Sequence, residues 1–91
     1  MGKRSPIEHR DALGEVLRVL REDAGLRQSD VADELDRPQS YVSKYERGEQ
    51  RLDILELRDV LAALGTDLKE FSIVLEAKLT RIGPGRRPQR L

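Results

Sequence analysis

The chain contains no cysteine and no tryptophan among its 91 residues, and only 3% of the residues are aromatic. The absence of cysteine excludes disulfides, a thiol nucleophile and thiolate metal ligands. A chain of this length supports one small domain. Because aromatic side chains are scarce, its core must consist mainly of Leu, Val and Ala.

Long apolar runs are also missing. No stretch approaches the roughly 20 apolar residues that a membrane-spanning helix needs. The opening MGKRSPIEHR lacks the apolar region of a signal peptide. These absences predict a cytoplasmic protein with no membrane partner.

The chain has no net charge, since Lys plus Arg and Asp plus Glu both number 17. This neutrality argues mildly against nucleic-acid binding, because such domains are often basic. The charges are unevenly distributed, however. Residues 81–91 contain no acid and hold Arg81, Arg86, Arg87 and Arg90. The rest of the chain is therefore acidic, and any basic surface on it must be local.

No group of residues indicates catalysis. His9 is the single histidine and has no cysteine or second histidine with which to share a metal. The acids fall at helix caps and on outer helix faces, and no glycine-rich phosphate loop follows a strand. We therefore predict no enzymatic activity, no metal site, no cofactor and no small-molecule ligand.

Helix signals recur along the chain. Ser5-Pro6-Ile7-Glu8 is typical of a helix start, with a capping box and proline at the first helical position. Apolar residues at helical spacing then predict a helix over 6–24: Leu13, Val16, Leu17, Leu20 and Ala24. Asp53 and Asp67 begin two more such segments, which end before Gly65 and Gly83. The first has Ile54, Leu57, Val60, Leu61 and Leu64 on one face, and the second has Leu68, Phe71, Leu75 and Leu79.

Two shorter helices are predicted between these segments, at 28–35 and 38–47. No run alternates as a strand does, so the sequence predicts a compact, all-α, five-helix domain. The two short helices have the spacing of a helix-turn-helix. Their inward side chains are predicted to be Val31, Ala32, Leu35, Val42 and Tyr45. Helical spacing then turns outward Gln39, Ser40, Ser43, Lys44 and Arg47.

Residues 13–65, and above all LRQSDVADELDRPQSYVSKYERGE, resemble the helix-turn-helix domain of phage-type repressors, the Cro/C1 or XRE family. The resemblance is carried by Gln28, Ala32, Val42, Ser43 and the YERG at 45–48. It implies a lambda-repressor-like domain that binds DNA as a symmetric dimer, with the 38–47 helix in the major groove. Two positions depart from the family pattern: Asp36 replaces the usual turn glycine, and Arg27 replaces the usual Ser or Thr cap.

The outward face supplies the candidate DNA contacts. The predicted base contacts are Gln39, Ser40, Ser43 and Lys44, and the amide of Gln39 suits the N6 and N7 atoms of adenine. The predicted phosphate contacts are Arg27, Gln28, Tyr41, Arg47 and Arg51. The alternative is a solvated surface on which Arg47 and Arg51 pair with Glu46 or Glu49.

The predicted organisation is an N-terminal arm (1–5), a DNA-binding domain (6–66), a C-terminal helix (67–82) and a flexible basic tail (83–91). The C-terminal helix is apolar on more than one side, which favours a homodimer interface. Its predicted contacts are Phe71, Val74, Leu75 and Leu79. The alternative is a wide stripe that faces only the helix's own core.

Together these features predict a sequence-specific, double-stranded DNA-binding transcriptional regulator of the repressor type, acting as a homodimer on a two-fold operator. A second hypothesis is an antitoxin or adaptor that binds a protein partner through its last helix, with DNA binding secondary.

Overall fold

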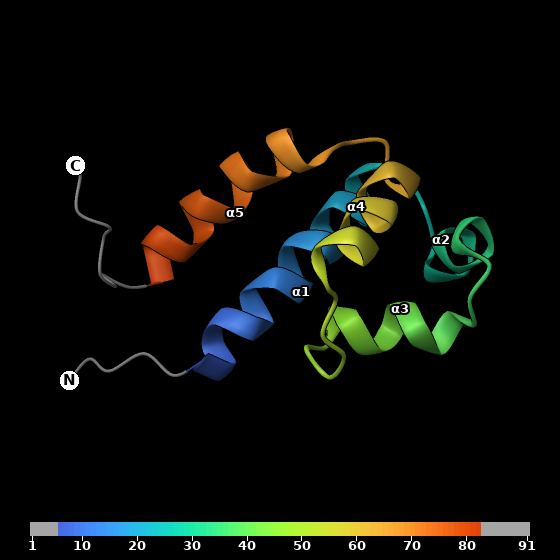
Figure 1. Cartoon of the computed structure of the whole chain (residues 1–91), viewed down its shortest axis with the longest axis horizontal. Helices are drawn as coiled ribbons and strands as arrows, with labels where there is room; N and C mark the ends of the chain where they lie inside the picture. The colour runs from blue at the N-terminus through green and yellow to red at the C-terminus, as the bar shows by residue number, and fades with distance from the viewer. Residues whose placement is uncertain (1–5, 83–91) are drawn as a thin grey trace.

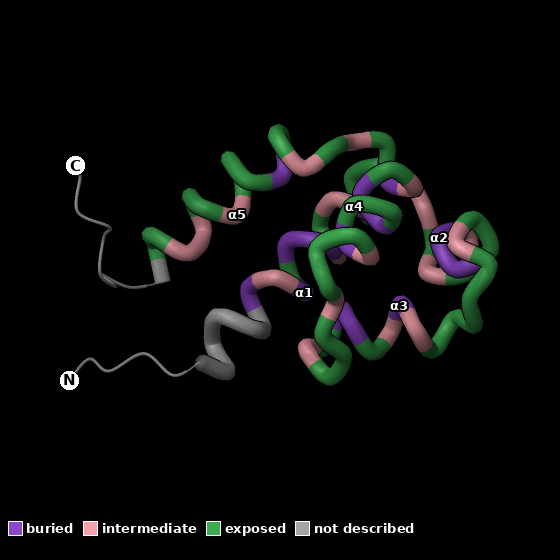
Figure 2. Tube along the Cα trace, viewed as in Figure 1, coloured by how far each residue is buried: buried purple, intermediate pink, exposed green. Residues whose placement is uncertain are grey.

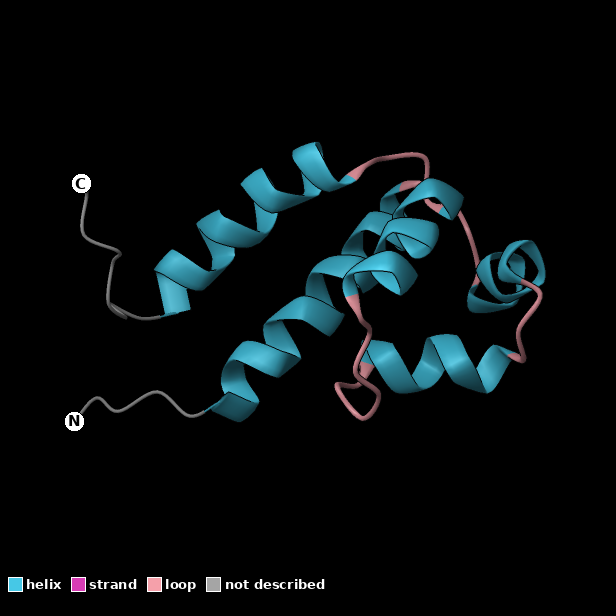
Figure 3. Ribbon diagram, viewed as in Figure 1, coloured by secondary structure: helices cyan, strands magenta, loops and turns pink. Residues whose placement is uncertain are grey.

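The structure is a computed structural model that describes the backbone of residues 6–82 and the side chains of residues 12–81. Its helices are α1 (Pro6–Asp23), α2 (Gln28–Leu35), α3 (Gln39–Glu46), α4 (Ile54–Ala63) and α5 (Leu68–Ile82). Figure 3 shows that loops alone connect them, and residues 6–82 contain no strand. The predicted five-helix, all-α fold is confirmed. The predicted arm and tail, the Ser5 cap and the side chain of His9 lie outside the described residues.

The helices form two pairs with α4 between them. α1 and α5 lie side by side and run in opposite directions, so that the start of α1 and the end of α5 share one end of the molecule (Figure 1). α2 and α3 pack against each other at the other end. No helix within residues 6–82 combines the length and apolar character needed to cross a bilayer.

The helix starts follow the cap signals of the sequence. At α4, the carboxylate of Asp53 accepts the backbone N–H of Glu56 at 2.7 Å, and that of Glu56 accepts the N–H of Asp53 at 2.9 Å. At α5, Asp67 accepts the N–H of Glu70 at 2.9 Å. These bonds satisfy N–H groups that have no partner within the helix.

Every helix contributes buried positions to one core (Figure 2). The core residues are Val16, Leu17, Val31, Ala32, Val42, Tyr45, Leu57, Val60, Leu61, Leu64 and Phe71. Two residues predicted on apolar stripes are exposed instead. Ala24 lies beyond the end of α1 in the turn at Gly25, and Ile54 is the first residue of α4, ahead of the stripe that begins at Leu57.

Gly14 is the point at which α1 crosses the C-terminal end of α3. A Cβ atom built on Gly14 would meet the backbone carbonyl oxygen of Glu46 and lie 2.6 Å from that of Tyr45. These are backbone atoms, which cannot rotate aside as a flexible side chain can. Glycine is therefore required here for close approach of the two helices.

We expect Gly14→Ala to destabilise the fold by about 1–3 kcal/mol, because the added methyl group overpacks the α1–α3 contact. Urea unfolding of the wild type and the variant measures this change. The sign of the change in unfolding free energy distinguishes the two cases, since Gly→Ala in an open helix interior stabilises by about 1 kcal/mol. A stabilised variant would contradict the close approach.

Candidate nucleic-acid interface

The turn between α2 and α3 is built around Asp36. Its φ of 57° is the one positive value among the non-glycine residues that the structure describes. The N–H of Asp36 bonds the carbonyl of Asp33 at 3.1 Å, and that of Arg37 bonds the carbonyl of Ala32 at 2.9 Å. Aspartate tolerates this left-handed conformation better than most residues, so the predicted turn forms without the usual glycine.

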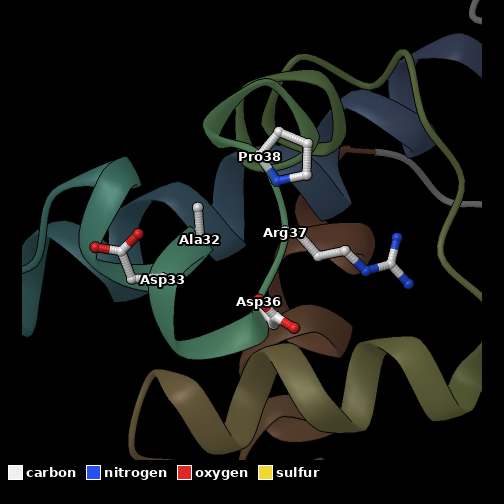
Figure 4. A pocket seen from close by; sticks show the side chains of 5 residues that line it. All are labelled: Ala32, Asp33, Asp36, Arg37 and Pro38. Atoms are coloured by element: carbon white, nitrogen blue, oxygen red, sulfur yellow. The ribbon is translucent and has the colours of Figure 1, made fainter.

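A shallow surface depression lies at the same turn, lined by Ala32, Asp33, Asp36, Arg37 and Pro38. The charged side chains of this depression point in different directions, as Figure 4 shows. The polar groups of a small-molecule site, by contrast, usually converge on the ligand.

α3 is oriented as its sequence predicts. Val42 and Tyr45 are buried, at 0% and 3% exposure. Burial raises the pKa of the Tyr45 phenol, so this side chain is a neutral part of the core. Ser43 is half-buried, and the exposed residues of the predicted outward face are Gln39, Ser40, Lys44 and Arg47.

An ion pair between α1 and α3 lies behind this face. Nε of Arg21 donates to Oε2 of Glu46 at 2.7 Å, and its Nη2 donates to Oε1 at 3.0 Å. The remaining Nη1 donates to the carbonyl of Leu26 at 2.9 Å. Both side chains are largely buried, at 11% and 3% exposure. The bidentate geometry compensates the charges in a site that water barely reaches.

This pair was not among the predicted contacts, although the sequence contains a signal for it. Arg21 follows the buried Leu17 by four residues, and Glu46 follows the buried Val42 by four. Residues four apart share one face of a helix. Two opposite charges one turn beyond core residues therefore indicate a buried pair.

The ion pair continues as hydrogen bonds to the tip of α3. Gln28 Nε2 donates to Oε1 of Glu46 at 2.9 Å, and Gln39 Nε2 donates to Oε1 of Gln28 at 2.6 Å. We call this chain of side chains, from Arg21 through Glu46 and Gln28 to Gln39, the polar relay. A carboxylate only accepts, so Gln28 must turn its amino group inward and its oxygen outward. The Gln39 side chain therefore keeps its oxygen and one N–H, neither of which bonds another residue in 12–81.

Two predicted phosphate contacts are held by neighbouring carboxylates. Arg27 donates through Nη2 to Oδ1 of Asp30 at 3.0 Å. Arg47 donates to both oxygens of Glu49 at 3.0 Å and also contacts the Ser43 hydroxyl. Pairing of Arg47 with Glu49 was one of the alternatives left open by the sequence. The hydrogen bonds from these arginines lower the pKa of both Asp30 and Glu49. Lys44 and Arg51 form no ion pair with any residue in 12–81.

The start of α2 lacks the usual side-chain cap, as expected from Arg27, which has no acceptor atom. Asp30 offsets part of this loss from within the helix, because its Oδ2 accepts the backbone N–H of Arg27 at 2.7 Å. This bond is one of the two hydrogen bonds of a capping box. The other, from the backbone N–H of Asp30 to the side chain of residue 27, cannot form because arginine has no acceptor.

Tyr41 is a residue of α3 that packs against the edge of the core. Its half-buried ring meets that of Tyr45 edge to face at 5.6 Å, and the Arg37 guanidinium lies 4.6 Å above it. Burial and the charge of Glu56 raise the pKa of Tyr41. These surroundings favour packing as its main role, and the predicted phosphate contact remains a prediction.

The C-terminal helix differs from its prediction at Phe71. Phe71 is 3% exposed and belongs to the protomer's own core, so it is not available as an interface residue. Leu75 and Leu79 are half-buried. The exposed apolar residues of α5 include Ile73 at 63% and Val74 at 44%. A salt bridge of 3.2 Å from Lys78 to Glu15 ties α5 to α1.

Comparison with known proteins identifies the class of this fold. A family model described as a helix-turn-helix domain matches residues 12–72. An XRE-family like protein from Pseudomonas syringae pv. tomato str. DC3000 aligns with a TM-score of 0.71 and 41% identity, over 78% of this chain and 87% of that chain. The clp gene regulator ClgR from C. glutamicum aligns with a TM-score of 0.73 and 29% identity, over 84% and 96%.

The restriction-modification controller protein C.Esp1396I, a tetramer in complex with its natural 35 base-pair operator, aligns with a TM-score of 0.71 over 85% of this chain and 99% of that chain. Its identity of 22% makes this a likeness of fold alone. No curated protein sequence matches the chain.

The paired helices α2 and α3, the tight turn at Asp36 and the matching family model define a helix-turn-helix DNA-binding protein. More narrowly, the chain belongs to the XRE family of helix-turn-helix transcription regulators.

We expect Arg21→Met and Glu46→Leu to destabilise the fold by about 3–5 kcal/mol each, because each leaves the other charge buried and unpaired. The double variant should lose much less than the sum, since it leaves no unpaired charge. Urea unfolding of the four proteins gives the coupling energy. Additive losses would show that the two side chains act independently.

Proposed function

We propose that this protein is a sequence-specific, double-stranded DNA-binding transcriptional regulator of the repressor type, which acts as a homodimer by occupying a two-fold operator. The observation that carries the proposal is the polar relay, which holds the side chain of Gln39 at the exposed tip of α3. A fixed amide at the start of an exposed helix suits base reading in the major groove.

The polarity of the relay favours adenine over guanine at the base that Gln39 meets. Its free oxygen accepts from the adenine N6 amino group, and its remaining N–H donates to N7. Guanine presents two acceptors, O6 and N7. Gln39 has only one N–H left for them, because the other is bonded to Gln28.

The other predicted contacts complete the interface. Ser40, Ser43 and Lys44 lie along α3 beyond Gln39 and are proposed to read further bases. Phosphate contacts are proposed for Arg27, Gln28, Tyr41, Arg47 and Arg51, of which the exposed members are Arg27, Arg47 and Arg51. These contacts set the register of the protein on the duplex, and the base contacts give its specificity.

A second copy of the chain is proposed to pack against α5. The exposed pair Ile73 and Val74 supplies apolar surface, and the half-buried Leu75 and Leu79 remain proposed contacts. A symmetric dimer would read two half-sites about 34 Å apart, one turn of DNA. C.Esp1396I is a tetramer on its operator, which supports assembly on DNA within this fold.

The same exposed surface of α5 also supports the second candidate, an antitoxin or adaptor that binds a protein partner there. A cytoplasmic location is part of both proposals.

We expect a selection of duplexes from random DNA, at roughly 150 mM salt, to yield a two-fold site. Gln39→Ala should relax the preference at one matched position per half-site by about 1–3 kcal/mol. Gln28→Ala, which keeps residue Gln39 but releases its second N–H from the relay, should weaken the adenine-over-guanine preference at that same position. The proposal would be contradicted if the wild type enriched no site, or if the wild type, Gln39→Ala and Gln28→Ala all enriched the same site. Either result would favour a protein partner.

We expect Ile73→Glu to weaken dimerisation by more than roughly tenfold, because it places a charge in the apolar contact of both copies. Sedimentation equilibrium of the wild type and the variant measures this. Ile54→Glu is the matched control, since Ile54 is a similarly exposed isoleucine, at 60%, on α4. Dissociation by Ile54→Glu alone would place the interface on α4 instead.

A further inference from the structure

Two acidic residues, Asp30 and Glu49, pair with arginines that are proposed to contact DNA. Glu49 holds Arg47 through two hydrogen bonds of 3.0 Å. Asp30 holds Arg27 through bonds of 3.0 and 3.2 Å. Four cations are proposed to contact DNA: Arg27, Lys44, Arg47 and Arg51. Two of them, Arg27 and Arg47, are thus already paired with an acid.

The backbone positions both acids for this pairing. Glu49 follows the turn at Gly48, where φ is 77°, and its own N–H bonds the carbonyl of Lys44 at 2.9 Å. Asp30 is fixed by its bond to the backbone N–H of Arg27. The charge of Lys44 also lowers the pKa of Glu49, so this carboxylate acts on two cations.

A carboxylate offers a guanidinium the same pair of acceptor oxygens that a phosphate offers. Each arginine must therefore exchange its acid for a phosphate when DNA arrives. The displaced acid then remains close to the phosphate and repels it. Sequence-independent affinity derives almost wholly from phosphate contacts, so it is the component that such pairing weakens most. The amide of Gln39, by contrast, bonds neither acid.

We propose that Asp30 and Glu49 are selectivity residues, which hold Arg27 and Arg47 in the free protein and thereby suppress binding to DNA that lacks the operator sequence. This inference rests on the proposed function and deepens it. It also explains how a chain without net charge favours its own site over the excess of other sequences in a genome.

The test measures affinity of the full chain for a mixed-sequence duplex without the selected site, over a range of salt concentrations. Glu49→Gln and Asp30→Asn remove one negative charge each, and Asn keeps an oxygen to accept the N–H of Arg27. We expect each variant to bind this duplex about twofold to fivefold more tightly. The slope of log K against log salt should steepen by up to about 0.9.

Glu22→Gln is the matched control. Glu22 pairs with Arg18 on α1 at 3.1 Å, and Arg18 keeps a contact of 3.9 Å with Glu15 when Glu22 is neutralised. Glu22 also lies 4.0 Å from Arg21, which retains its bidentate bonds to Glu46. The change therefore removes the same charge outside the proposed interface. It should leave affinity and salt slope unchanged. Thermal unfolding verifies that all variants fold.

Equal tightening by Glu22→Gln would overturn the inference, because the effect would then reflect total charge. Unchanged affinity and slope in both Glu49→Gln and Asp30→Asn would overturn it as well, even if the wild type binds its selected duplex. A wild type that selects no duplex fails the proposed function itself, and this result is separate from the other two.

Discussion

The buried ion pair between Arg21 and Glu46 is the interaction on which the outward face of α3 depends. A charge removed from water is tolerated only where its partners are close and complete. Here the guanidinium meets a carboxylate on α3 and the carbonyl of Leu26 after α1, and the carboxylate also takes the amide of Gln28 on α2. Three segments of the chain are thereby held in one relative position. Gly14 allows this arrangement, because it lets α1 approach the end of α3 closely enough for the pair to form.

The consequence is a fixed direction of hydrogen bonding from the core to the surface. Glu46 cannot donate, so Gln28 has only one orientation that satisfies both Glu46 and Gln39, and Gln39 must donate to the oxygen of Gln28. The direction set at a buried carboxylate therefore reaches Gln39 at the exposed tip of α3. Preorganisation of this kind reduces the conformational entropy lost when a flexible glutamine binds a partner. α1 contacts both α3 and α5, so the same rigid helix relates the polar face to the exposed residues of α5.

The sequence was sufficient for the parts of the fold that depend on local signals. Helix starts at Asp53 and Asp67 follow from caps a few residues long, and the inward positions of Val42 and Tyr45 follow from helical spacing. Helical spacing places Arg21 and Glu46 beside core residues and so makes them a candidate pair, but their contact depends on how α1 packs against α3. The close approach at Gly14 depends on the same packing, and no local signal gives it. Phe71 was assigned to an interface because a wide apolar stripe does not say which neighbour covers it. The structure answers that question for Phe71, which the core of its own chain covers, and leaves Ile73 and Val74 outside.

The neutrality of the chain, which first argued against nucleic-acid binding, is consistent with the way its charges are paired. Attraction between a basic surface and phosphates falls steeply with salt and does not distinguish one sequence from another. In this protein the exposed Arg27 and Arg47 are each neutralised locally, whereas Gln39 is directed by bonds that carry no net charge at the surface. Directional hydrogen bonds depend on the identity of the base, and they are screened less by salt than long-range attraction is. A surface that limits its own electrostatic attraction therefore leaves a larger share of the binding energy to contacts that read sequence.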